Sequence, residues 1–131
     1  MARITLLLHN IRSAHNVGSI FRTADGFGIG RIILTGYTPH PIYDGDPRLP
    51  HIAQKIHKQI DKTALGATAS VQWNYYDNLS TWLDGNTLPL VALEQSERSV
   101  TLKDFRAPDE FVLVLGEEVD GSDRTLLEKC E

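Results

Sequence analysis

The sequence has few of the features that would place it in a special class of protein. It contains one cysteine, Cys130, so no disulfide can form within the chain, and no pattern of Cys and His has metal-ligand spacing. The longest apolar runs, residues 4–8 and 111–115, are far shorter than the roughly 20 residues that span a bilayer. The first run lacks a following small-residue cleavage site, which favours a strand over a signal peptide. We therefore expect a cytoplasmic protein with no membrane partner and no bound metal.

Length and composition predict one domain over residues 1–131. With 41% hydrophobic and 23% charged residues, the chain is long enough for one core and too short for two ordinary domains. The net charge of −4 is unevenly distributed: residues 1–62 hold eight Lys and Arg, four Asp and all five histidines, so residues 63–131 carry −8. The basic first half can supply contacts to nucleic-acid phosphates. An ordinary solvated surface with a local charge bias explains the same pattern.

Short apolar runs alternate with segments of helical or turn character. The runs that we interpret as strands are residues 4–8, 31–34, 71–75, 88–93 and 111–115. They are nearly continuous rather than alternating, which is typical of a parallel sheet covered on both faces. The expected fold class is therefore α/β, with helices on both faces of a parallel sheet.

Three helices are expected between these strands. The clearest covers residues 14–27, with Ser13 as its N-cap. Its apolar residues recur at three- and four-residue spacing and form one stripe, namely Val17, Ile20, Phe21, Ala24 and Phe27. A shorter helix over residues 77–83 is expected to be capped by Asp77 and stopped by Gly85, and a weaker helical pattern covers residues 58–67.

A long loop is expected between residues 38 and 50. Four prolines and the triplet Asp44-Gly45-Asp46 exclude a helix or a central strand there. Long loops in compact domains are usually functional or mobile. Arg48 and His51, at the far end of the loop, are placed where they could meet a substrate, although a mobile insertion fits the sequence equally well.

The residues after the first expected strand form a candidate ligand site. Open α/β sheets bind ligands beyond the carboxyl ends of their strands, where a loop leads into a helix. On the expected helix, His15, Gly18 and Arg22 share one face. A gap without a side chain at Gly18, beside a cation, would suit a closely approaching phosphate or ribose. The alternative is that Gly18 only packs and that Arg22 is a solvated surface residue.

The whole string from residue 10 to 28 resembles the first motif of the SpoU/TrmH family of RNA methyltransferases, N-x-R-x-x-x-N-x-G-x-x-x-R-T-A-x-x-F-G. All nine fixed positions match: Asn10, Arg12, Asn16, Gly18, Arg22, Thr23, Ala24, Phe27 and Gly28. Nine fixed positions within 19 residues form a specific signal, and it outweighs the reading of Arg22 as an ordinary surface arginine.

A second family motif, an apolar strand followed by G-x-E-x-x-G, corroborates the first. Here it consists of residues 111–115 followed by Gly116, Glu118 and Gly121. On its own this pattern is weak, because many α/β proteins have a strand, a glycine and an acidic turn. The resemblance extends to residues 62–67 and 91–94 and so covers essentially the whole chain.

The resemblance implies the SPOUT fold, in which the C-terminal part of an α/β domain forms a trefoil knot that holds S-adenosylmethionine. It also implies a homodimer and an RNA substrate, either tRNA or rRNA. The third family motif, which contains a Ser-Leu-Asn triplet, does not occur in the chain. We therefore expect a catalytic domain that is incomplete at its C-terminus, with an incomplete knot, and leave open whether this chain alone is active.

Residue roles are carried over from the family by position. The expected catalytic residues are Arg22, Asn16 and Glu118. The expected cofactor-binding residues are Leu93, Gly116, Glu118 and Gly121, and the expected RNA-binding residues are Asn10, Arg12, His15, Arg22 and Arg48. The resemblance gives Arg22 a contact to ribose or phosphate and a part in deprotonating the 2′-hydroxyl. Because a guanidinium stays protonated and is a poor base, positioning is its better-supported role.

Two other classes of function remain open. A doubly wound nucleotide-binding enzyme would carry G-x-G-x-x-G after its first strand, whereas this chain has Asn10-Ile11-Arg12 there. A non-catalytic RNA-binding fragment of the same family fits the missing third motif. The resemblance does not choose between tRNA and rRNA, nor does it indicate which nucleotide is modified.

Overall fold

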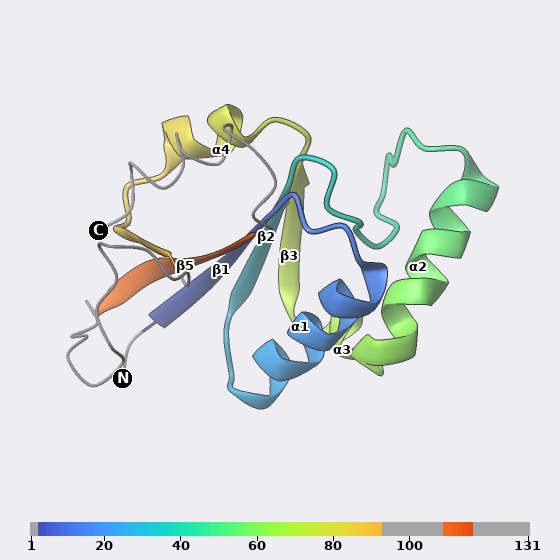
Figure 1. Ribbon diagram of the computed structural model, residues 1–131, viewed down its shortest axis with the longest axis horizontal. Helices are drawn as coiled ribbons and strands as arrows, with labels where there is room; N and C mark the ends of the chain where they lie inside the picture. Colours follow the sequence, from blue (N-terminus) through green and yellow to red (C-terminus); the bar gives the residue numbers. More distant parts are fainter. Residues whose placement is uncertain (1–2, 93–108, 117–131) are drawn as a thin grey trace.

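The computed structural model describes residues 3–92 and 109–116, which form a parallel sheet flanked by helices (Figure 1). The elements in chain order are β1 (Arg3–His9), α1 (Ala14–Gly26), β2 (Arg31–Thr35), α2 (Pro50–Ala64), α3 (Ala67–Ser70), β3 (Gln72–Tyr76), α4 (Leu79–Gly85), β4 (Leu90–Ala92) and β5 (Glu110–Gly116). Each strand coincides with one of the five apolar runs, so the predicted α/β class is confirmed.

The five strands are parallel and follow the order β3-β2-β1-β5-β4. The chain first moves outward from β1 through β2 to β3, and then returns to build the other half of the sheet on the far side of β1. The switch point therefore lies between β1 and β5, where Leu7 pairs with Val114. Dinucleotide-binding sheets of order 3-2-1-4-5-6 place strand 4 there instead. This order, like the missing glycine motif, argues against that class.

Both faces of the sheet are covered by apolar side chains, as predicted. On one face, strand residues such as Leu8 and Leu34 pack against Phe21 of α1 and Ile60 of α2. On the opposite face, a second cluster formed by Leu7, Ile33, Leu90, Val112 and Val114 packs against side chains of α4, which lies on the other side of the sheet from α1, α2 and α3 (Figure 1). Successive strand residues alternate between the two clusters because side chains point to opposite faces.

Helix α1 begins at the predicted residue but ends at Gly26, before Phe27. The Ser13 hydroxyl accepts a hydrogen bond from the Asn16 backbone N–H at 3.1 Å, which confirms the N-cap. Val17, Phe21 and Ala24 are fully buried, as the apolar stripe requires. Phe27 was wrongly assigned to that stripe, because its side chain is 80% exposed. It is the C-cap, with φ −93° and ψ 0°, so the chain has already left the helical path there.

The other helices differ from their predicted bounds. The helix expected over residues 58–67 begins earlier, at Pro50, where proline suits the first turn, and ends at Ala64. A separate short helix, α3, follows it. Helix α4 begins at Leu79 and is capped by Asn78 rather than Asp77, because the Asn78 side chain accepts from the Ser80 backbone N–H at 2.9 Å.

Neither a membrane-crossing helix nor a metal-binding cluster is present in residues 3–92 and 109–116. No helix there has the length and apolar character that would cross a membrane. No three His, Cys, Asp or Glu side chains in these residues come together in the way that would hold a metal ion.

Candidate functional site

The carboxyl ends of β1 and β5 meet at the switch point, where α/β sheets bind ligands. The last residues of these strands, His9 and Gly116, are register partners. A Cβ built on Gly116 would lie 3.0 Å from the His9 carbonyl oxygen, which is tighter than ordinary van der Waals contact. Glycine therefore lets β5 end close against β1 and leaves its backbone accessible. The other predicted cofactor residues, Leu93, Glu118 and Gly121, lie outside the described residues.

Asn10 braces the turn that follows β1. Its backbone has φ +54°, in the left-handed region that asparagine tolerates better than most residues. Its side-chain oxygen accepts from the Tyr37 backbone N–H at 3.1 Å, and its own N–H donates to the Thr35 carbonyl at 3.3 Å. A Cβ at the neighbouring Gly36 would collide with that side-chain oxygen. These bonds give Asn10 a bracing role in the turn, whereas contact between Asn10 and RNA stays a prediction.

A buried polar network that was not predicted from the sequence joins the ends of β1 and β2. His9 Nδ1 lies 2.9 Å from the Thr35 hydroxyl. The Thr38 hydroxyl accepts from the Ile11 backbone N–H at 3.1 Å and lies 2.7 Å from the Thr35 carbonyl and 3.1 Å from the Leu8 carbonyl, either of which can take its proton. The sequence does contain an indication of this network, because a polar residue, His9 or Thr35, directly follows each of the first two apolar runs. The network fixes the edge of the sheet on which the first motif stands.

The first motif places polar side chains at the start of α1. Arg12 precedes the helix, and His15 and Asn16 occupy its first turn, with all three side chains exposed. Arg22 is also exposed, but it lies eight residues after Ala14, about 12 Å farther along the helix axis. The structure therefore brings Arg12, His15 and Asn16 to the carboxyl end of the sheet and holds Arg22 away from it.

Gly18 does not face a ligand, as had been predicted for this side of α1. It is buried against α2, and a Cβ there would collide with the Thr63 hydroxyl and the Ile60 carbonyl oxygen. Thr63 also donates its hydroxyl hydrogen to the His15 carbonyl at 2.7 Å. The proposed gap for a phosphate or ribose is therefore wrong, because the space beside Gly18 is filled by α2. This motif glycine serves the close approach of two helices.

Arg48 holds the predicted loop together. Its guanidinium donates to both Asp46 carboxylate oxygens, with a shortest distance of 2.7 Å, and to the carbonyls of His40 and Pro41 at 3.1 and 3.0 Å. This leaves at most one of its five N–H groups for a ligand. Hydrogen bonding from Arg48 lowers the pKa of Asp46 to about 2. The long loop is confirmed, and its interior bonds give Arg48 a structural role, while RNA contact by this residue remains untested.

His40 anchors the same loop to β3. Its ring stacks on Tyr75 with a centroid distance of 3.7 Å and an interplanar angle of 15°. The Tyr75 hydroxyl donates to the Gly36 carbonyl at 2.7 Å, which fixes the position of the Tyr75 ring in this stack. Burial, with a further contribution from the nearby Arg48 charge, lowers the pKa of His40 to about 4. At neutral pH the loop is therefore packed around an uncharged imidazole.

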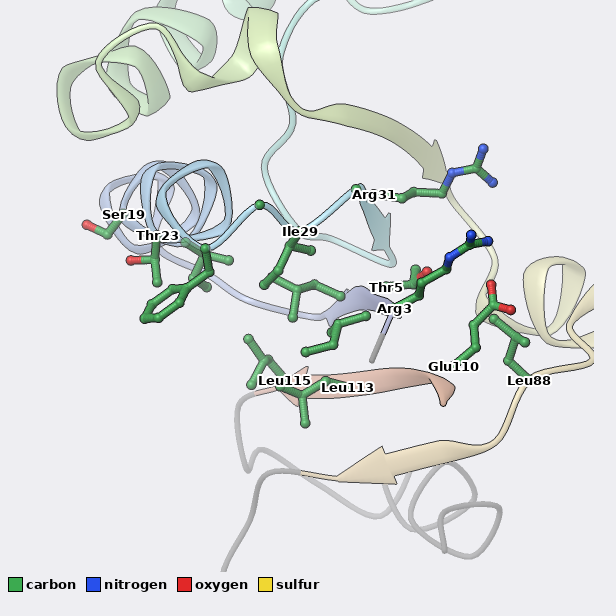
Figure 2. A pocket seen from close by; sticks show the side chains of 16 residues that line it. Arg3, Thr5, Ser19, Thr23, Ile29, Arg31, Leu88, Glu110, Leu113 and Leu115 are labelled. Atoms are coloured by element: carbon green, nitrogen blue, oxygen red, sulfur yellow. The ribbon is translucent and has the colours of Figure 1, made fainter. Parts of the chain in front are cut away.

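A groove of about 1030 Å³ runs along the flank of α1 that faces away from α2 (Figure 2). Leu113 and Leu115 of β5 form one wall, and Ser19 and Thr23 of α1 stand on the other. Arg3, Arg31 and Glu110 lie at the opposite end, beside the amino ends of the strands (Figure 2). The exposed Phe27 borders this groove. The groove extends away from the carboxyl edge where α/β sheets bind ligands.

Comparisons with solved structures agree with this fold. An AdoMet-bound rRNA methyltransferase from Sinorhizobium meliloti superposes with a TM-score of 0.73 at 22% sequence identity, covering 98% of this chain and 44% of that one. The TrmH/SpoU tRNA modifying enzyme from A. aeolicus gives a TM-score of 0.63 at 21% identity, covering all of this chain and 60% of that one. These likenesses show the fold, and the described residues have the architecture of SPOUT methyltransferases. The predicted knot falls on residues outside the described ranges and stays a prediction.

Sequence comparisons point to the same family. A protein from Staphylococcus epidermidis that is named as a TrmH family tRNA/rRNA methyltransferase is 25% identical over 128 residues, which is 96% of this chain and 46% of the relative. A relative from Staphylococcus saprophyticus is 26% identical over 129 residues. The chain thus spans about half the length of the curated relatives that it matches. The sequence profile of the SpoU rRNA Methylase family matches residues 3–131, and the chain therefore belongs to that family.

Proposed function

We propose that the protein transfers a methyl group from S-adenosylmethionine to a ribose 2′-hydroxyl of tRNA or rRNA. The observation that carries the proposal is the junction of the two family motifs at one edge of the sheet. Asn10 follows β1, Gly116 ends β5, and these adjacent strands form the switch point. A ligand bound at this edge contacts both motifs. The names of the relatives, which specify tRNA, rRNA and AdoMet, support the same proposal.

The described part of the site fits a close approach of S-adenosylmethionine. At Gly116 a side chain would crowd the His9 carbonyl, so glycine leaves the end of β5 without a side chain there. Such a bare edge admits a bulky adenosine moiety to main-chain distance. When bound, the cofactor supplies an electrophilic methyl group on its sulfonium. Leu93, Glu118 and Gly121 are proposed to complete the cofactor contacts.

The start of α1 is suited to hold the RNA backbone. Arg12 brings a permanent positive charge, and the positive end of the helix dipole adds to it. Asn16 and His15, exposed in the first turn, offer hydrogen-bonding groups to ribose and phosphate oxygens. Aligning the 2′-oxygen with the methyl carbon supplies much of the rate of such a transfer. These residues are therefore proposed to position the nucleotide, and Arg22 to hold the ribose or the adjacent phosphate.

The distance of Arg22 from the carboxyl edge supports a homodimer. Arg22 lies about 12 Å along α1 from the first residue of the helix, so it does not reach Gly116 of its own chain easily. Exposed Phe27 and the apolar side of the groove are surfaces of the kind that mark contacts between proteins. We propose that Arg22 of one chain serves the site of a second copy.

Methyl transfer from labelled S-adenosylmethionine to separate tRNA and rRNA pools tests the function. Nuclease digestion followed by mass spectrometry should find the label in 2′-O-methylated nucleosides from one of the pools. Label on a base would contradict the ribose assignment. RNA binding without any methyl incorporation would favour the alternative, a non-catalytic RNA-binding protein.

Mixing two inactive variants tests the shared site. Arg22→Ala removes the proposed positioning group, and Gly116→Val crowds the proposed cofactor edge. If each site uses Arg22 of one chain and Gly116 of the other, mixed dimers contain one intact site and recover up to a quarter of the original activity when the chains mix statistically. No recovery, with mixed dimers verified by native mass spectrometry, would mean that both residues serve the same chain's site.

A further inference from the structure

Helix α2 carries a row of basic residues on its exposed side. His51, Lys55, Lys58 and Lys62 are separated by four, three and four residues, which places them on one face of the helix. All four side chains are exposed. The row extends over twelve residues, about 16 Å along the axis. We call these four residues the basic face of α2.

The basic face has no acidic residue within it. The acidic residue of α2 is Asp61, whose carboxylate lies 3.1 Å from His57 Nε2 and accepts a hydrogen bond from the Thr68 hydroxyl at 2.8 Å. These contacts hold Asp61 on a flank of the helix, against α3. Protein surfaces usually mix both signs of charge. A one-sign face on a chain with a net charge of −4 is therefore unlike an ordinary solvated helix surface.

Lysines are confined to this helix in the described parts of the chain. Within residues 3–92 and 109–116, the three lysines are Lys55, Lys58 and Lys62. Lysine is a flexible point charge that suits phosphate contacts without demanding a fixed geometry. The concentration of this residue type on one helix points to a polyanion that is bound through its phosphates.

The basic face is rigidly joined to the start of α1. Gly18 and the hydrogen bond from Thr63 to the His15 carbonyl hold the two helices in close contact. Between them lies a second groove of about 600 Å³, lined by Ala14, His15, Gln59, Lys62 and Thr63. Lys62 thus belongs both to the basic face and to this groove. The groove leads from the basic face to the first turn of α1, where Asn16 lies.

The first half of α2 extends past α1 on the side of the loop that follows β2. The Ile42 backbone N–H donates to His57 Nδ1 at 3.0 Å, so the loop is docked on the helix there. Figure 1 shows α2 at the rim of the molecule, with its first residues beyond the start of α1. The charges of Lys55 and Lys58 therefore stand outside the proposed methyl-transfer site but in line with the groove that leads to it.

We propose that the basic face of α2, together with the α1–α2 groove, is the track on which RNA phosphates outside the modified nucleotide are bound. The inference rests on the proposed function in taking RNA as the partner. It adds the basic face of α2, which lies outside the two family motifs. Contacts to phosphates position the RNA without reading its sequence.

Matched charge neutralisation tests the track. Lys55→Gln/Lys58→Gln removes two charges from the basic face, and Arg3→Gln/Arg31→Gln removes two exposed charges at the amino ends of β1 and β2. The two double variants have the same net charge. Glutamine has nearly the helix propensity of lysine, so α2 should keep its stability. Fluorescence anisotropy with labelled bulk tRNA and labelled rRNA fragments, over a series of KCl concentrations, gives the affinity and its salt dependence.

We expect the lysine pair to weaken RNA binding about tenfold or more at roughly 0.1 M salt, and to reduce the slope of log affinity against log salt by about 1.4 to 1.8. The arginine pair should stay within about twofold of the unaltered protein, since only charges that contact phosphates release counterions. Equal loss in both pairs would mean that net charge alone acts, and the proposed track would be wrong. Unchanged binding by the lysine pair would overturn it as well.

Methyl transfer measured on the same variants separates this inference from the proposed function. A raised KM for RNA with a nearly unchanged kcat is expected for the lysine pair. Unchanged KM and binding, with normal methyl transfer, would refute the track and leave the function standing. RNA binding through the lysines without methyl transfer would refute the function and leave the track standing. No RNA binding by the unaltered protein at low salt would contradict both.

Discussion

The two flanks of helix α1 differ in how they use the first family motif. On the flank toward α2, Gly18 is buried, and the two helices meet at backbone distance. On the outward flank, Thr23 and Phe27 are exposed and border an open groove. Arg22 shares the face of Gly18 but is exposed farther along the helix, where α2 does not cover it. One continuous motif thus contains residues that pack the fold and residues that are proposed to act on the substrate. A fixed position in a family motif does not by itself identify a ligand contact.

Removing Arg22 should have the largest effect. Arg22→Ala is expected to lower the rate of methyl transfer about 100-fold or more, because a positioned cation near the reacting oxygen is lost. Its free energy of unfolding should change by less than about 0.5 kcal/mol, since the side chain is exposed. Arg31→Ala is the matched control, exposed on β2 at the far end of the sheet. An unchanged rate of methyl transfer in Arg22→Ala would show that Arg22 has no part in the reaction.

Adding a side chain at Gly18 should break the packed flank. Gly18→Ala is expected to lower the free energy of unfolding by about 2 to 3 kcal/mol, because the new Cβ meets the Ile60 carbonyl and α2 must move. Gly26→Ala, in the last turn of the same helix with no atom within 4 Å of the added Cβ, should change stability little or raise it slightly. Chemical denaturation measures both. Equal stability of the two variants would show that the helices do not meet as closely as described.

The loop after β2 should make stability depend on pH. Because burial lowers the pKa of His40 from 6.5 to about 4, the unfolded chain binds more protons than the folded chain between these values. The stabilisation from neutral His40 is complete above pH 6.5 and is lost as pH falls toward 4, by roughly 1 to 3 kcal/mol. Asp46, Arg48, Tyr43 and Tyr75 surround the ring, and among them Asp46 titrates near pH 2, below this window.

His40→Phe isolates that contribution, because a phenyl ring can keep the stack on Tyr75 without titrating. Denaturation curves at several pH values between 4 and 7 should show a smaller slope of stability against pH for this variant. The same slope in both proteins would assign the pH dependence to other groups.

The smallest effect is expected from the hydrogen bond that joins α2 to α1. Thr63→Val keeps the shape of the side chain but removes the donor to the His15 carbonyl, and should cost about 1 kcal/mol. Thr81→Val, at an exposed position of α4, is the control and should change stability by less than about 0.5 kcal/mol. If Thr63→Val is as stable as its control, close packing at Gly18 alone joins the helices.

Much of the fold was predictable because local physics and the sequence pattern agree. The five apolar runs became the five strands, and Ser13 became the N-cap of α1, since burial on both sheet faces and capping both act on short stretches of chain. The start of α2 was missed because few of its residues are apolar, and Pro50 was taken as part of the loop rather than as a first-turn residue. The cap of α4 is Asn78 rather than Asp77. The sequence alone did not decide between them, because either side chain can accept a hydrogen bond from a backbone N–H of the first turn.

The site was predictable only in its position along the chain. Family motifs identify residues 10–28 and Gly116, and the rule for parallel sheets places them near the carboxyl edge. Whether each residue packs or remains accessible depends on what lies next to it in space. Gly18 and Arg22 share a helical face in projection, but α2 covers only the first of them.

The sequence by itself determined the strands, the main helix, the family and the uneven charge. Tertiary structure decided which motif residues form the scaffold, because α2 comes from a distant part of the chain and its position against Gly18 cannot be deduced from spacing. It also determined that Arg48 is enclosed by its own loop and that Lys55, Lys58 and Lys62 form one exposed face joined to the start of α1. Burial and charge at each position are set by neighbours in space, which local pattern does not contain.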